Sequence, residues 1–273
     1  MYRPDSKLIP ALRGMAAASL LVALAATAQD APPPEPAAAT STQTTAPPAW
    51  QPEQLQTSRA VAEAFPEPEV NWLEVDGQAV LAPYRTALNA KKMTLLSLVN
   101  RPAEMLQDNV MRTLYLSMPD YGWPTMLLLL PPYMPGESDP SLDQSAAARL
   151  AAAINFAIEQ ESVALTLLAD TETAPQAIAA SIAQRDNVSG LILWHVDADK
   201  LDANLLQQLV ESRTSVLDIV AEPMDLRARN DRRRLFELAG FGEDYQLIIA
   251  PGDPPAHAVK RMRRWLGNSF EVN

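Results

Sequence analysis

The chain has 273 residues, no cysteine and a net charge of −11 at pH 7. Without cysteine there is no disulfide framework and no thiolate chemistry, so a hydrophobic core must stabilise the fold. The acidic balance is unfavourable for general nucleic-acid binding, because the phosphate backbone attracts basic surfaces.

Residues 1–28 have the pattern of a secretory signal peptide. Basic residues precede an apolar run over 15–25, and an Ala-Thr-Ala cleavage site ends at Ala28. The run is shorter than the roughly 20 residues that a membrane-spanning helix needs, so cleavage is favoured over a permanent anchor. We therefore expect export to the periplasm and a mature form that begins at Gln29 and has no transmembrane span.

Residues 29–56 are rich in proline, alanine and threonine and contain almost nothing that could pack into a core. This composition predicts a disordered linker with polyproline character. A single ordered domain is predicted over 57–273, because that length suffices to bury one core.

The domain begins with a predicted hairpin and continues with alternating strands and helices. Asp76-Gly77 favours a type I′ turn between VNWLEV and QAVLAPYR. The runs MTLLSLV, PTMLLLL, VALTLL, GLILWH, SVLDIV and YQLIIA are largely apolar, which is typical of strands covered on both faces. Helices are predicted over 143–160, 201–212, 226–239 and 255–266. The sequence thus predicts an α/β domain with a mainly parallel sheet, an N-terminal antiparallel hairpin and helices on both faces.

Several stretches together resemble a known family. They are NWLEVDGQAVLAPYR, MPDYGWPTMLLLLPP, RLAAAINFAIEQESVALTLL and HAVKRMRRWL, spread in this order over residues 70–266. They are similar to the bacterial exported α/β-hydrolase-like family known as domain of unknown function thirty-five thirty. The resemblance implies an α/β-hydrolase fold and an envelope location, and it implies no particular activity.

A catalytic nucleophile of that fold would follow the strand VALTLL, in a sharp G-x-S-x-G turn between strand and helix. The chain there reads Ala169-Asp170-Thr171-Glu172-Thr173, so Thr171 occupies the serine position and both glycines are missing. The β-branched Thr173 opposes a strained turn. The other interpretation of this segment is a helix N-terminus capped by Asp170 or Thr171.

The acid and the base of a triad would follow the last two strands. In the family pattern, Asp225, with Glu222 as the alternate, stands at the acid position, and His257 stands at the base position. With Thr171 they would form the arrangement that an esterase uses. Alternatively, Asp225 caps the helix that begins at residue 226, and His257 is a polar helix residue.

The loop that would supply the oxyanion hole is also unusual. After MTLLSLV it reads Asn100-Arg101-Pro102-Ala103 in place of a His-Gly type loop. Pro102 removes one backbone N–H donor from this loop.

His195 is the remaining histidine, and it precedes Asp197 and Asp199 at the end of a predicted strand. Such a cluster could hold a metal, although closely spaced carboxylates are also common in polar loops. We predict no metal and no cofactor.

Residues 226–273 carry nine basic and six acidic side chains, against the acidic balance of the whole chain. Such asymmetry can mark contact with an anionic envelope component, and the alternative is the solvated outer faces of two helices. The arginines of the predicted contact are Arg232, Arg233, Arg234, Arg261 and Arg264.

Two functions from different classes follow from these patterns. The missing glycines and Pro102 favour a catalytically degenerate hydrolase fold, kept as a binding or scaffold module in the periplasm. The alternative is an esterase-like hydrolase that uses Thr171, His257 and Asp225. Fold alone does not decide between them.

Overall fold

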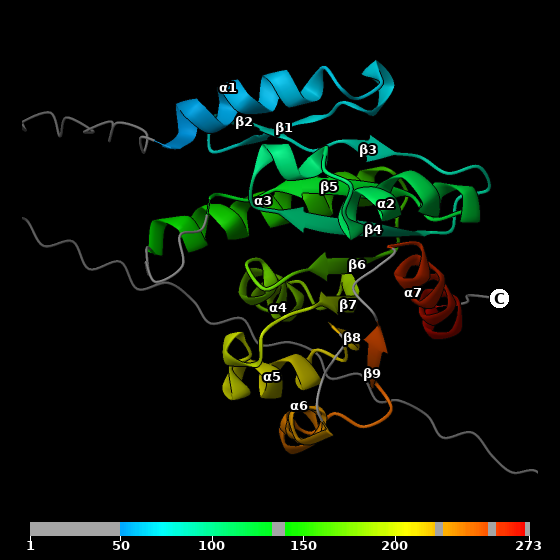
Figure 1. Ribbon diagram of the computed structural model, residues 1–273. Helices are drawn as coiled ribbons and strands as arrows, with labels where there is room; N and C mark the ends of the chain where they lie inside the picture. The colour runs from blue at the N-terminus through cyan, green and yellow to red at the C-terminus, as the bar shows by residue number, and fades with distance from the viewer. Residues whose placement is uncertain (1–49, 133–139, 222–225, 251–254, 271–273) are drawn as a thin grey trace, which may run out of the picture. The chain divides into compact units, whose positions relative to one another are not determined.

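The computed structural model describes residues 50–132, 140–221, 226–250 and 255–270 (Figure 1). Its centre is a seven-stranded sheet with the order β3-β5-β4-β6-β7-β8-β9. The strands are Tyr84–Arg85 (β3), Met93–Val99 (β4), Thr125–Leu129 (β5), Ala164–Ala169 (β6), Val188–Trp194 (β7), Ser215–Ala221 (β8) and Tyr245–Ala250 (β9). β3 pairs with β5 in antiparallel orientation, and every other neighbouring pair is parallel. The predicted mainly parallel sheet is confirmed.

The predicted hairpin forms a separate two-stranded sheet from β1 (Trp72–Val75) and β2 (Gln78–Leu81). Its turn residues Asp76 and Gly77 have φ angles of 50° and 75°, as a type I′ turn requires. The second predicted strand is longer than β2, and the structure divides it at Pro83. Because proline has no N–H to donate, the chain leaves the hairpin there and resumes as β3 in the main sheet.

Helices cover both faces of the main sheet. They are α2 (Val110–Ser117), α3 (Pro140–Glu159), α4 (Ala174–Ala183), α5 (Ala203–Glu211), α6 (Leu226–Ala239) and α7 (Pro255–Phe270), while α1 (Trp50–Ala62) packs against β2 of the hairpin. The connection from β4 to β5 runs one way along the sheet, and the later connections run the other way. Because parallel crossovers are right-handed, α2 covers one face and α3 to α6 cover the other. α7 packs against α2 and therefore shares its face (Figure 1).

The core lies between these layers. Every residue of β4, β5 and β6 is buried, which explains why their sequences are largely apolar. Leu96, Leu127 and Leu167 on these neighbouring strands are fully buried. None of the helices in the described part of the chain is both long enough and apolar enough to cross a membrane.

The ordered domain begins earlier than the sequence predicts. α1 begins at Trp50, inside the predicted linker over 29–56, rather than near Thr57. The side chain of Gln54 donates to the carbonyl of Leu130 (2.9 Å) and accepts from Arg149 (2.9 Å). These contacts hold the start of α1 on the domain, although its composition resembles that of the linker.

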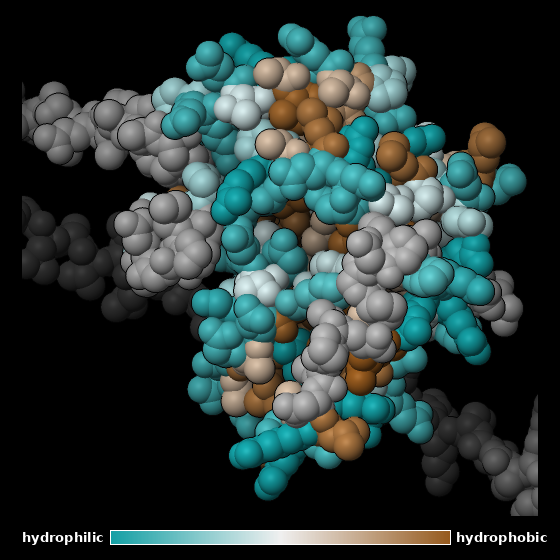
Figure 2. Space-filling model, viewed as in Figure 1, coloured by the Kyte–Doolittle hydropathy of each residue, from teal (hydrophilic) through white to brown (hydrophobic). Residues whose placement is uncertain are grey.

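The five arginines predicted to form one anionic-binding surface do not lie together. Arg232 is buried, with its side chain 2% exposed, and forms an ion pair with Asp218 on β8 (2.7 Å). Arg233 and Arg234 are exposed on α6, where mostly hydrophilic residues cover the bottom of the view in Figure 2. The remaining two arginines belong to α7, which lies on the other face of the sheet. The prediction is therefore wrong for Arg232, because its ion pair with Asp218 holds the guanidinium in the core.

Candidate functional site

The carboxyl ends of β4, β6 and β7 meet at one edge of the sheet. In open α/β sheets this edge is where ligands and catalytic groups are usually found. It brings together the segment after β4 that begins at Asn100, the turn after β6 that contains Thr171, and His195 after β7. We refer to this edge as the carboxyl edge.

Thr171 is partly buried, and both hydrogen-bonding functions of its hydroxyl are occupied. It donates to the carbonyl oxygen of His195 (2.9 Å) and accepts from the N–H of Asp197 (3.2 Å). A nucleophile must direct its proton toward a base, and a backbone carbonyl is not one. In this structure the hydroxyl joins the turn after β6 to the loop after β7.

The backbone around Thr171 is also unlike a strained nucleophile turn. The described non-glycine residues with positive φ include His195, but they do not include Thr171 or its neighbours in this turn. Asp170 orders the turn, since its Oδ1 accepts from the N–H groups of Glu172 (3.0 Å) and Thr173 (3.1 Å). The hydroxyl of Thr173 donates to the Asp170 carboxylate and accepts from the Asp170 N–H. Asp170 therefore orders the turn that leads into α4, whose N-cap residue is Thr173 rather than the predicted Asp170 or Thr171.

The loop after β4 is ordered by a carboxylate of its own. Glu104 lies in a short 3₁₀ helix, Pro102–Met105, that follows β4. Its Oε2 accepts from the backbone N–H groups of Asn100 (3.2 Å) and Arg101 (3.3 Å). The N–H groups of Asn100 and Arg101 are therefore occupied within the protein.

The oxyanion hole of an α/β-hydrolase combines a backbone N–H from the loop that corresponds to the one after β4 with the N–H of the residue after the nucleophile. The second group here is the N–H of Glu172, which already donates to Asp170 (3.0 Å). Both kinds of donor thus bond a carboxylate of the same chain. A developing oxyanion would have to displace a bonded carboxylate to reach either of them.

Negative charge at the carboxyl edge adds to this effect. Glu172 accepts from the side-chain amide of Asn100 (2.9 Å), and Arg101 lies 3.6 Å from Glu172 and 3.8 Å from Glu104. Burial raises the pKa of Glu104, and the charge of Asp170 adds to the increase while Arg101 and the two backbone N–H donors oppose it. Glu104 and Glu172 thus share one guanidinium, and Asp170 adds further negative charge, which is the opposite of the environment that stabilises an oxyanion.

His195 has an unusual conformation at the end of β7. Its φ is 51°, its N–H donates to the carbonyl of Ile219 (2.8 Å), and its ring stacks on Trp194 with centroids 4.0 Å apart. Its Nε2 is buried and has no hydrogen-bond partner in the described part of the chain, and burial lowers the pKa of the ring. Burial therefore favours the neutral imidazole.

The predicted neighbours of His195 do not gather around it as metal ligands. Asp197 and Asp199 are both exposed, and Asp199 lies 3.9 Å from Lys200. Over 50–132, 140–221, 226–250 and 255–270, no three side chains of the types that bind metals come together.

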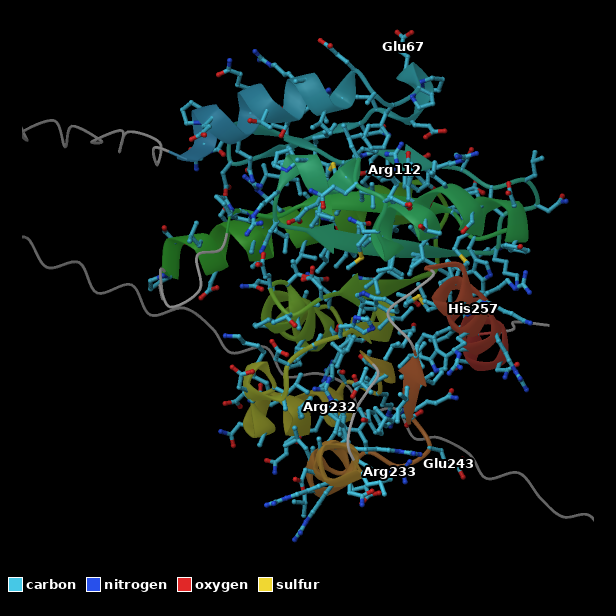
Figure 3. All side chains as sticks on the ribbon, viewed as in Figure 1. Glu67, Arg112, Arg232, Arg233, Glu243 and His257 are labelled. Atoms are coloured by element: carbon cyan, nitrogen blue, oxygen red, sulfur yellow. The ribbon has the colours of Figure 1, made fainter. Side chains whose placement is uncertain are left out.

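The structure places only part of the predicted triad. His257 is exposed in the first turn of α7 (Figure 3), and no hydrogen bond joins it to Thr171 within the described residues. Asp225 and its alternate, Glu222, lie outside the described residues. The arrangement of the three groups therefore stays a prediction.

Glu104 is the residue at this edge that the sequence analysis missed. The signal was present as Arg101-Pro102-Ala103-Glu104, because a proline at the first helical position and a glutamate at the third are typical of a helix start. That pattern predicts a cap for the N–H groups before the helix.

The comparisons with known proteins concern the fold. No protein-family model matches the sequence, and no curated protein matches it. Among solved structures, an α/β serine hydrolase without a lid from Xanthomonas campestris is 12% identical with a TM-score of 0.55, and the match covers 77% of this chain and 98% of that one. An α/β serine hydrolase homologue from Coxiella burnetii is 12% identical with a TM-score of 0.54 and coverages of 74% and 97%. This chain has the α/β-hydrolase fold.

A cold-adapted esterase from an Arctic intertidal metagenomic library is also similar. It is 16% identical with a TM-score of 0.53, and the match covers 74% of this chain and 93% of that one. At such identities the similarity concerns the fold alone, so the function has to be argued from the carboxyl edge.

Proposed function

We propose that this α/β-hydrolase fold is catalytically degenerate and serves as a binding or scaffold module in the periplasm. One observation carries the proposal. The backbone N–H groups of Asn100, Arg101 and Glu172, which correspond to the oxyanion donors of a hydrolase, all bond carboxylates of the chain itself. Losing a single such donor costs a working hydrolase about 10²–10³ in kcat.

The state of Thr171 supports the same proposal. Its hydroxyl donates to the carbonyl of His195 and accepts from the N–H of Asp197, and these two hydrogen bonds give the residue a structural role. A structural threonine explains why the serine and both glycines of the usual turn can be absent.

The proposal is tested by turnover of p-nitrophenyl acetate and butyrate with the purified chain. A real enzyme exceeds the uncatalysed rate by orders of magnitude, and we expect the rate of the buffer alone. Thr171→Ala and His257→Ala should leave that rate unchanged. Thr113→Ala is the matched control, because the Thr113 hydroxyl makes a local bond on α2, to the carbonyl of Asn109 (2.8 Å). Turnover that disappears in both Thr171→Ala and His257→Ala, and persists in Thr113→Ala, would refute the proposal.

The esterase-like alternative uses Thr171 as nucleophile, His257 as base and Asp225 as acid. The similarity of this fold to that of a cold-adapted esterase favours it. It requires the Thr171 hydroxyl to leave the His195 carbonyl when substrate binds. Under this alternative Asp225→Asn would also abolish turnover, since the acid fixes the tautomer of the base.

We also infer export, on the signal-peptide pattern over 1–28. The mature chain is expected in the periplasmic fraction with Gln29 as its first residue. Mass spectrometry of the intact protein measures this directly. An uncleaved chain in the inner-membrane fraction would contradict it.

A further inference from the structure

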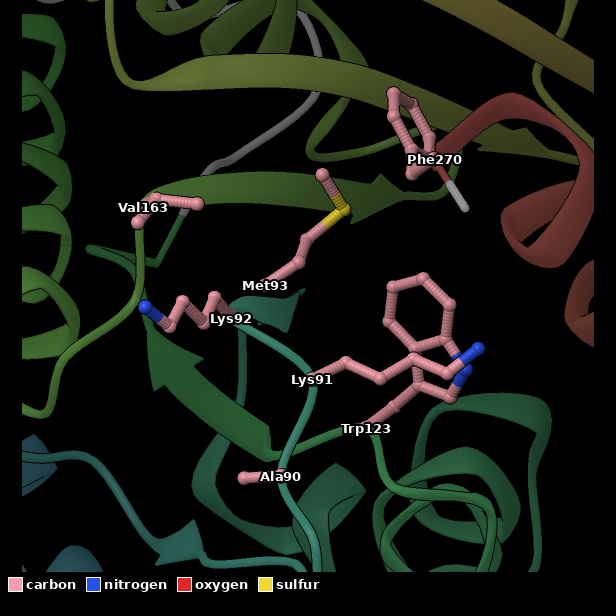
Figure 4. A pocket seen from close by; sticks show the side chains of 7 residues that line it. All are labelled: Ala90, Lys91, Lys92, Met93, Trp123, Val163 and Phe270. Atoms are coloured by element: carbon pink, nitrogen blue, oxygen red, sulfur yellow. The ribbon is translucent and has the colours of Figure 1, made fainter. Parts of the chain in front are cut away.

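A recess opens at the amino ends of β4 and β6, at the edge of the sheet opposite the carboxyl edge (Figure 4). Its volume is about 500 Å³, within the range of roughly 300–1,000 Å³ that small-molecule pockets occupy. Its lining comes from segment 90–93 at the start of β4, from Trp123 before β5, from Val163 before β6 and from Phe270 at the end of α7. We call it the amino-edge recess.

The inside of the amino-edge recess is largely apolar. Met93 and Trp123 are buried beneath it, Phe270 forms one wall, and Val163 is 62% exposed at its rim. Gly190 on β7 makes room for that wall, since a Cβ on this residue would lie 2.9 Å from Cζ of Phe270. A side chain other than glycine would therefore push Phe270 from its place. A hollow with a largely apolar lining and a few polar groups at its rim is typical of a ligand site.

Two lysines supply positive charge at the rim. The ammonium of Lys91 lies 4.7 Å from the ring centroid of Trp123, while Lys92 extends toward Val163 (Figure 4). Both side chains are exposed, and within the described residues neither forms an ion pair with a carboxylate. Because the whole chain has a net charge of −11, positive charge here is a local feature of an acidic protein. The recess is thus complementary to an anion that carries an apolar tail.

We propose that the amino-edge recess binds an amphiphile with a single carboxylate, of the class of free fatty acids. The carboxylate lies at Lys91 and Lys92, and the acyl chain covers Met93 and Trp123. Lysine stems are themselves apolar, so both lysines can contact the chain and keep their ammonium groups in water beside the carboxylate. This binding does not rest on the proposed function, because the recess and the carboxyl edge are separate.

The test is calorimetric titration of the purified chain with sodium dodecanoate below its micellar concentration. One molecule is expected to bind per chain. Shortening the chain from twelve to eight carbons should weaken binding roughly fourfold per methylene, as expected for burial of apolar surface. Acetate has the same head group without the tail and should not bind. Dodecyltrimethylammonium has the same tail with the opposite charge and should bind at least tenfold more weakly.

Substitutions test whether dodecanoate binds in the amino-edge recess. Lys91→Met with Lys92→Met removes both charges and keeps the side-chain length, and it should weaken binding roughly three- to tenfold, in line with exposed charge pairs. Phe270→Ala should also weaken binding, by removing the apolar wall. Lys200→Met is the matched control at the carboxyl edge and should bind dodecanoate like the parent chain.

Two results would overturn the inference. The first is the absence of dodecanoate binding; if anionic phospholipid vesicles then capture the chain in a lysine-dependent way, this edge is a membrane contact instead. The second is equal binding of dodecanoate by the double lysine variant. Ester turnover has no part in this test, so its outcome is distinguishable from that of the proposed function.

Discussion

The buried ion pair between α6 and β8 makes a sharp prediction about stability. Arg232 holds Asp218 through two hydrogen bonds, from Nε (2.7 Å) and Nη2 (2.8 Å), and it donates a third to the carbonyl of Val196 (2.6 Å). The phenol of Tyr245 donates to the same carboxylate (2.9 Å). Burial, followed by the Asp218 charge, raises the pKa of Tyr245, so the phenol keeps its proton and remains a donor.

Arg232→Met removes the countercharge and leaves a fully buried carboxylate with one neutral donor. Breaking a buried pair in this way costs about 3–5 kcal/mol in the free energy of unfolding. In a domain of this size that corresponds to a fall in Tm of roughly 10 °C. Arg233→Met is the matched control on the exposed side of α6 (Figure 3), and it should change the free energy by no more than about 0.5 kcal/mol.

Urea unfolding followed by circular dichroism measures both variants. Combining Asp218→Asn with Arg232→Met removes both charges and should recover most of the lost stability, because no unpaired charge stays buried. The reasoning is refuted if Arg232→Met is no more destabilising than Arg233→Met.

Three further predictions follow from the described contacts. Thr171→Val should lower the free energy of unfolding by about 1–2 kcal/mol in urea titration, since it breaks two hydrogen bonds, and an unchanged value would remove the structural role of this hydroxyl. Gly190→Ala should cost about 1–3 kcal/mol in the same assay, because its Cβ would lie 2.7 Å from Thr166 Oγ1 and 2.9 Å from Phe270 Cζ. Burial raises the pKa of Glu104, so the folded chain binds this proton more tightly and loses stability as pH rises from about 4.3 through the higher folded pKa. Glu104→Gln should flatten that part of the stability profile, and an unaltered profile would assign the dependence to other groups.

The strands and their parallel direction could be predicted, because strands that are buried on both faces of a sheet are mostly apolar along their whole length. β4 and β6 are largely apolar and wholly buried, and the Asp76-Gly77 turn adopts the conformation that its residues favour. The helix over 226–239 has the predicted bounds, since Gly240 ends it with a φ of 103°. These features are local, so local patterns suffice.

Features that depend on distant contacts were missed. Arg232 stands in a run of basic residues, and only the fold brings Asp218 against it. α1 begins inside a stretch of linker-like composition because Gln54 bonds Leu130 and Arg149, which are far away in sequence. The amino-acid composition of a sequence segment reveals neither of these contacts.

At the carboxyl edge too, local features could be predicted from the sequence, whereas contacts between separate loops could not. The missing glycines around Thr171 could be read directly from the sequence. That Glu104 and Asp170 occupy the N–H groups of both halves of an oxyanion hole could not, because it depends on where two loops end in space. The sequence therefore indicated an altered nucleophile position, and the structure adds a physical argument for the proposed loss of catalysis.

Covalent labelling with an alkyl fluorophosphonate tests the central claim most directly. This probe reacts with a hydroxyl nucleophile only where a base and an oxyanion hole activate it, so an active serine esterase treated alongside should be fully labelled. For this chain the account predicts no phosphonate adduct when the intact protein and its peptides are measured by mass spectrometry. An adduct mapped to Thr171, and lost in His257→Ala, would contradict it.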